Sequence, residues 1–114
     1  MLAYQKSFQL ALDIQIITKK ITYSEKYALV DQIRRSSRSV CANFAEAYCR
    51  RKSVKHFISK LNDAQSESCE TQVWLEFAFA FAYINEEEYK LLTEQNNEIG
   101  KLLTYMILNP GKFI

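Results

Sequence analysis

The sequence predicts an all-α protein, a bundle of four long helices in a single domain that spans residues 1–114. The chain has only two glycines and one proline, so it lacks the turn residues that many short strands would require. Its apolar residues recur at helical spacing in four blocks. With 114 residues, of which 48% are hydrophobic, the chain is long enough to close one core.

The first two helices are predicted near residues 3–22 and 25–50. The apolar face of the first helix consists of Leu10, Ile14, Ile17 and Ile21. The second helix is expected to begin after Ser24, because a serine hydroxyl can accept a hydrogen bond from a free amide of the first turn. Its helical rhythm is carried by Val30, Ile33, Ser37, Val40 and Phe44.

The third helix is predicted near residues 53–83, with Ser53 as its N-cap. It contains the stretch WLEFAFAFAYI, residues 74–84, whose alternation of large and small residues is also typical of a β-strand. Residues 53–84 contain no turn signal, however, and a strand of that length would far exceed the usual range of roughly 3 to 10 residues. The stretch is therefore assigned to a helix.

The fourth helix is predicted near residues 86–108. Asn85 can cap its free amides, and three consecutive glutamates after it complement the positive end of the helix dipole. The helix is expected to end at Asn109, Pro110 and Gly111.

The third helix carries more apolar surface than one bundle face requires. On a helical wheel its apolar arc is about twice the ~100° that a helix at the edge of a bundle buries. One interpretation is that this helix is the most central of the four. The other is a contact with a second copy, since a monomer that exposes so much aromatic surface tends to aggregate. We expect a homo-oligomer whose interface contains Trp74, Phe77, Phe79 and Tyr83.

Positive charge is concentrated between residues 34 and 60, where eight Lys or Arg residues stand against one acid, Glu46, a local net charge of +7. Such an array suits the binding of nucleic-acid phosphates, because each cation placed against a phosphate releases condensed counterions. The alternative is a solvated face neutralised across the bundle by Asp31, Glu67 or Glu70. The candidate RNA- or DNA-binding residues are Arg34, Arg35, Arg38, Arg50, Arg51, Lys52 and Lys55.

Polar residues at helical spacing also predict a buried network between the second and third helices. Its expected members are Asn43, Glu46, Glu67 and Glu70. Small residues along the second helix, such as Ala42 and Ala45, would let a neighbouring backbone approach closely.

No enzyme site is evident in the sequence. The single histidine, His56, has serines three residues before and after it, so the Glu-x-x-His pairs of a di-iron bundle are absent. The chain also lacks a glycine-rich loop and any arrangement that would activate a nucleophile. We therefore expect no catalytic residues, no bound metal and no cofactor.

The composition favours a cytoplasmic protein. The chain begins without an apolar run of signal-peptide length, and no stretch approaches the ~20 apolar residues of a membrane span. Three cysteines, Cys41, Cys49 and Cys69, make an odd number without CxxC spacing, which is typical of reduced thiols. We expect no membrane partner.

Two motifs lie between residues 32 and 75. The first, Q-x-x-R-(S/A)-x-x-S-x-x-x-N-x-A-E-(G/A), is matched by Gln32, Arg35, Ser36, Ser39, Asn43, Ala45, Glu46 and Ala47. The second, F-I-x-K-L-x-x-A-x-x-E-(A/S)-x-E-T-x-x-W-L, is matched by Phe57, Ile58, Lys60, Leu61, Ala64, Glu67, Ser68, Glu70, Thr71, Trp74 and Leu75. In these motifs the chain resembles the four-helix bundle proteins first noticed as reading frames within intervening sequences of bacterial 23S ribosomal RNA genes.

The resemblance implies an antiparallel up-down bundle that assembles as a ring, commonly a pentamer. That family is also similar to the accessory protein of diversity-generating retroelements, a pentameric barrel that binds nucleic acid and works with a reverse transcriptase. Two hypotheses follow. One is a non-enzymatic homo-oligomer, a pentamer, that binds RNA or DNA phosphates without base specificity. The other is a protein-docking scaffold or accessory subunit with no direct nucleic-acid binding.

Overall fold

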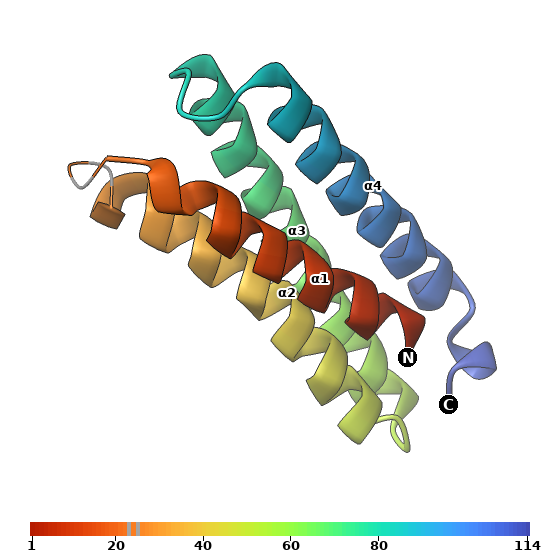
Figure 1. Ribbon diagram of the computed structural model, residues 1–114. Coiled ribbons are helices and arrows are strands. Elements are labelled where there is room, and N and C mark those ends of the chain that lie inside the picture. The colour runs from red at the N-terminus through yellow and green to blue at the C-terminus, as the bar shows by residue number, and fades with distance from the viewer. Residues whose placement is uncertain (23, 25) are drawn as a thin grey trace.

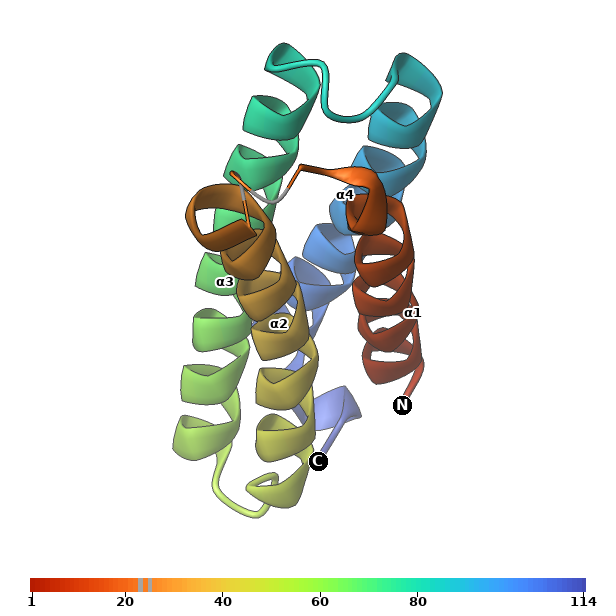
Figure 2. The same ribbon diagram turned by 60° about the vertical axis from the view of Figure 1, so that its left-hand side comes forward.

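Residues 1–22, 24 and 26–114, which the computed structural model describes, form four long helices that run in alternating directions (Figure 1). The helices are α1 (Leu2–Ile17), α2 (Asp31–Cys49), α3 (Val54–Ala80) and α4 (Glu86–Leu108). Each helix packs against the next along the chain, and α1 also packs against α4, so the four surround one core (Figure 2). The predicted all-α, four-helix bundle is confirmed.

The first two helices differ from the prediction at their ends. Helix α1 stops at Ile17, and a 3₁₀ turn, Thr18–Lys20, follows it. The buried Thr18 hydroxyl donates to the Ile14 carbonyl at 2.6 Å, which satisfies one of the last acceptors of the helix. The predicted start of the second helix at residue 25 lies outside the described residues. A π-helical turn, Lys26–Val30, leads directly into α2.

Helix α3 ends earlier than predicted, so the assignment of residues 81–83 to the helix is wrong. Ala82 adopts a left-handed backbone with φ of 61°. The Ala82 amide donates to the Phe79 carbonyl and the Tyr83 amide to the Ala78 carbonyl, both at 2.9 Å, which is the hydrogen-bond pattern of a Schellman turn. This turn directs Ile84 into the core, where it is buried.

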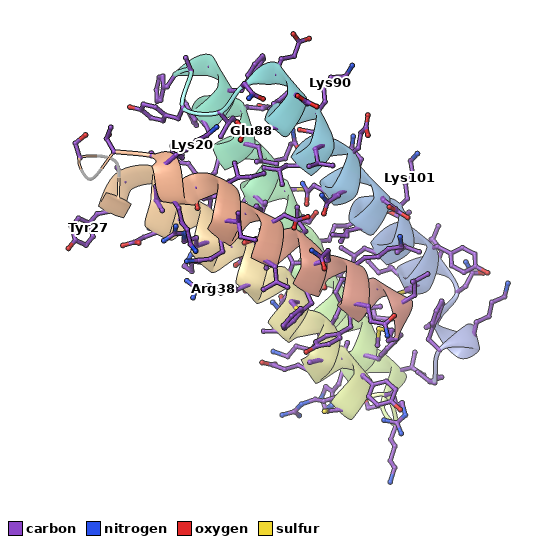
Figure 3. The ribbon with its side chains drawn as sticks, viewed as in Figure 1. Lys20, Tyr27, Arg38, Glu88, Lys90 and Lys101 are labelled. Carbon is purple, nitrogen blue, oxygen red and sulfur yellow. The ribbon has the colours of Figure 1, made fainter. Side chains whose placement is uncertain are left out.

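Helix α4 begins and ends where the sequence predicts. The Asn85 side chain accepts a hydrogen bond from the Glu88 amide at 2.8 Å, and the Asn85 amide donates to the Glu88 carboxylate at 2.9 Å. These two bonds make a capping box. The Glu88 carboxylate also pairs with Lys20, which ties the start of α4 to the segment after α1 (Figure 3).

All four helices contribute to the core. Its fully buried large side chains include Leu10, Ile14, Ile33, Phe44, Phe57, Leu61, Leu75, Leu92, Ile99 and Leu103. Buried hydrogen bonds also cross between helices: Thr71 donates to Ser36 at 2.8 Å, Ser68 donates to the Asn96 side chain at 3.0 Å, and the side-chain amide of Asn96 donates to the Ser68 carbonyl at 3.0 Å. Because buried polar groups require partners, these contacts favour one register of α3 against α2 and α4.

None of the described helices combines the length and apolarity needed to cross a bilayer.

Candidate nucleic-acid interface

Arg34, the first of the seven candidate cations, donates hydrogen bonds to the end of α1. Its Nε donates to the Thr18 hydroxyl at 2.9 Å, and its Nη2 donates to the Gln15 carbonyl at 3.3 Å. Both acceptors lie at the C-terminal end of α1, where backbone carbonyls lack helical partners and positive charge is favoured. Arg34 therefore holds the end of α1 against α2.

Arg35 is also occupied, by two carboxylates of α3. Its Nη2 lies 2.7 Å from a Glu70 oxygen and 3.2 Å from a Glu67 oxygen. The hydrogen bond from Arg35 keeps the pKa of Glu70 below its usual value, and the same bond raises the pKa of Arg35. The charge of Arg35 is therefore neutralised by carboxylates of the neighbouring helix, which is the alternative that the sequence analysis gave for the basic residues.

Arg38 has an exposed side chain on α2 (Figure 3). Its Nε donates to the Arg34 carbonyl of its own helix at 3.0 Å. Among the ion pairs of the described residues, none involves Arg38. Its charge therefore remains available to a partner.

The turn between α2 and α3 collects the other four candidates, Arg50, Arg51, Lys52 and Lys55, which we call the basic turn. Arg50 ends α2, its amide donating to the carbonyls of Glu46 and Ala47, and Ser53 caps α3 by accepting the His56 amide at 3.3 Å. These two helix ends hold four cations within six residues of the chain. The described part of the chain offers none of them a carboxylate within ion-pairing distance.

Arg51 differs from its neighbours on the basic turn by stacking on an aromatic ring. Its guanidinium carbon lies 4.0 Å from the centre of the Tyr48 ring, and its Nη1 donates to the Tyr48 carbonyl at 2.9 Å. The side chains of Arg50, Lys52 and Lys55 are exposed. Since Arg38 and Arg50 are 12 residues apart on α2, about 18 Å along the helix axis, the predicted patch is divided into separate parts.

The four residues of the predicted polar network do not meet at one place. Glu67 and Glu70 are joined through Arg35, whereas Glu46 pairs with Lys60 of α3 at 3.0 Å. The hydrogen bond with Glu46 raises the pKa of Lys60. Asn43 donates to the Ser39 carbonyl at 3.0 Å and stays within its own helix. Glu46, Glu67 and Glu70 thus connect α2 and α3 through ion pairs on the bundle surface, and the four residues do not form one buried network.

Aromatic rings form a ladder along the C-terminal part of α3, where the sequence predicted an oligomer interface. The ring centres of Trp74 and Phe77 are 6.0 Å apart, those of Phe77 and Phe81 are 5.7 Å apart, and Tyr83 continues the series from Phe81 at 5.7 Å. Phe77 is 44% exposed and Phe81 is 55% exposed. We call Trp74, Phe77 and Phe81 the aromatic ridge.

Phe79 lies apart from this ridge. Its ring stacks on Tyr89 of α4, with ring centres 4.5 Å apart and an angle of 15° between the planes. Phe79 was predicted as an interface residue together with Trp74, Phe77 and Tyr83. In the structure it contacts α4 of the same chain and stays 39% exposed.

A groove between α1 and α2 is a feature that the sequence reasoning missed. Two cavities of about 420 and 500 Å³ adjoin there and share Tyr4 and Ala45. We call the cavity of about 420 Å³ the α1–α2 groove, and its walls include Tyr4, Phe8, Leu12, Arg38, Ala42 and Ala45. The sequence signal was the spacing of four residues between Tyr4, Phe8 and Leu12, which places apolar side chains beyond the core-facing stripe of α1.

Across the described residues, no group of three or more His, Cys, Asp or Glu side chains is placed to hold an ion.

A sequence model and a solved structure match this chain. The sequence model described as "23S rRNA-intervening sequence protein" matches residues 1–105. No curated protein matches the chain. A similar solved structure is the crystal structure of a protein of unknown function from the S23 ribosomal protein family of Bacteroides thetaiotaomicron. It is 35% identical in sequence with a TM-score of 0.84, over 92% of this chain and 97% of that one.

Proposed function

The chain belongs to the 23S rRNA-intervening sequence protein family, and from that premise we propose that it is a non-enzymatic homo-oligomer, a pentamer, that binds RNA or DNA through phosphates. The related crystal structure is of a protein of unknown function, so the family supplies the fold and no activity. The proposal therefore depends on the surface of this chain.

The observation that carries the proposal is the basic turn. Arg34 and Arg35 have partners within the chain, whereas Arg50, Lys52 and Lys55 are exposed and stand outside the described ion pairs. Cations without carboxylate partners are the ones that gain most from a phosphate, because no existing pair must be broken. Assembly would repeat the turn in every subunit and so increase the field that attracts a polyanion.

The test is a salt titration of binding to random-sequence RNA and to random-sequence duplex DNA. We expect affinity to fall linearly with salt concentration on logarithmic axes, without preference for sequence. The double substitution Arg50→Glu and Lys52→Glu should abolish binding at about 150 mM salt. It should leave the mass of the assembly unchanged, since the turn lies outside the aromatic ridge.

The matched control reverses two exposed lysines of α4, Lys90→Glu and Lys101→Glu (Figure 3). These substitutions change the net charge of the chain by the same amount, so a purely global charge effect would weaken binding equally. Equal loss in both double variants, or undiminished binding by the basic-turn variant, would contradict the proposal. A wild-type protein with no nucleic-acid affinity that retains one protein partner after nuclease treatment would instead support the docking scaffold.

A further inference from the structure

We propose that the α1–α2 groove of one copy receives the aromatic ridge of the next copy. This inference rests on the homo-oligomer of the proposed function and names the two surfaces that would build it. Only the ridge was expected from the sequence; the groove is the new element.

The two surfaces are unlike and lie on different helices. The ridge lies at the C-terminal end of α3, with Phe81 directly after the helix, and the groove lies between α1 and α2. A contact between two unlike surfaces leaves each pair of copies with one free ridge and one free groove. Copies therefore continue to add, and they form a closed ring where the rotation between neighbours closes, whereas a contact between identical surfaces would stop at a dimer.

The groove has the shape and composition of a receptor for aromatic side chains. Phe8 and Leu12 form its apolar wall and are 48% and 44% exposed. Tyr4 adds a ring whose centre lies 6.1 Å from that of Phe8. On the α2 side the wall includes Ala42 and Ala45, whose small side chains leave room for a ring to approach the helix backbone.

The charges at the rims are complementary. Arg38 lines the groove and has no carboxylate partner in the described part of the chain. Glu76 directly precedes Phe77 of the ridge, and Glu86 and Glu87 begin α4 just after the turn that follows the ridge. All three glutamates are exposed and outside the described ion pairs. An apolar centre with opposite charges at its edges is typical of a specific interface, and a second copy supplies both halves.

The experiment uses two full-length variants, each with one surface spoiled. Phe77→Glu with Phe81→Glu spoils the ridge, and Leu12→Glu with Ala42→Glu spoils the groove. Each variant is also made with serine in place of glutamate. The version whose circular dichroism spectrum shows the helix content of the wild type is used. Leu91→Glu, at an exposed position of α4 outside both surfaces, is the control. Mass is measured by light scattering coupled to gel filtration, for each variant alone and for an equimolar mixture.

We expect the wild type and the Leu91→Glu control to contain several chains and each spoiled variant to have the 13.4 kDa mass of one chain. The mixture should give twice that mass and nothing larger, because the intact groove of one variant can accept the intact ridge of the other only once. Spoiled variants that still assemble alone, or a mixture that stays at one chain, would overturn the inference but leave the homo-oligomer standing. A wild type with the mass of one chain would overturn both.

Discussion

At the level of single residues, the cations between positions 34 and 60 divide into those with partners inside the chain and those without. Arg35 contacts Glu67 and Glu70, whereas Arg50 has no carboxylate partner in the described part of the chain. The sequence identified both the cations and the carboxylates, but it could not pair them. Pairing depends on how each helix is rotated about its axis and on which side chains reach across, and helical spacing within one segment does not specify either.

The Arg35–Glu70 pair makes the stability of the bundle depend on pH. Because its folded pKa lies below the ordinary value of 4.5, the ionised Glu70 side chain contributes stability above about pH 4.5 and loses it as the pH falls through the folded pKa. We expect Glu70→Gln to lower the free energy of unfolding near pH 7 by less than about 1 kcal/mol, as is usual for exposed pairs. At about pH 3 the substitution should cost much less.

Urea unfolding at the two pH values measures this difference. Glu94→Gln is the matched control, since Glu94 is an exposed residue of α4 outside the described ion pairs. A cost of Glu70→Gln that is the same at both pH values would show that the carboxylate charge contributes nothing.

At the level of helices, the ends show what local sequence determines. The start of α4 was predictable because Asn85 and Glu88 are both visible in the sequence at capping-box spacing. The end of α3 was not, because Ala82 occupies a left-handed position that usually carries glycine. Likewise, α1 ends at Ile17 although Ile21 continues its apolar rhythm, since Thr18 and Arg34 satisfy its last carbonyls.

The left-handed alanine gives a prediction about the α3–α4 turn. Ala82→Gly removes the Cβ that disfavours this backbone, so the free energy of unfolding should increase by about 1 kcal/mol. Ala80→Gly provides the opposite control two residues earlier. Ala80 is the last residue of α3, where glycine adds freedom to the unfolded chain without relieving strain, and we expect a loss of about 0.5 to 1 kcal/mol. Urea unfolding measures both, and a change of the same sign in the two variants would contradict the argument.

At the level of the whole molecule, helical periodicity was sufficient for the core and insufficient for the outer surfaces. Leu10, Ile14, Phe44 and Phe57 lie in the core because the periodic stripe of each helix must be buried. Phe77, Phe79 and Phe81 have the same apolar character and all stay exposed, yet Phe79 stacks on Tyr89 of α4 whereas Phe77 and Phe81 contact each other. The difference depends on how far the neighbouring helix extends and where α3 ends, both of which are properties of the assembled bundle.

The final prediction links the aromatic ridge to the basic turn. If a ring repeats the turn, a nucleic acid long enough to touch several subunits should bind more tightly than a short one, because later contacts become intramolecular. One chain measures 44 Å in its longest dimension. A 10-base-pair duplex, about 34 Å long, is shorter than that, whereas a 40-base-pair duplex, about 136 Å long, exceeds it roughly threefold. We expect the wild type to bind the longer duplex at least about tenfold more tightly per molecule of DNA.

The ridge variant Phe77→Glu with Phe81→Glu should bind the short duplex with the affinity of the wild type, since its basic turn is intact. It should lose most of the increase in affinity that the wild type shows for the longer duplex. Fluorescence anisotropy at one fixed salt concentration measures all four affinities. If the ridge variant has the mass of one chain and still binds the longer duplex as tightly as the wild type does, the basic turns act independently. Assembly would then serve a purpose other than nucleic-acid binding.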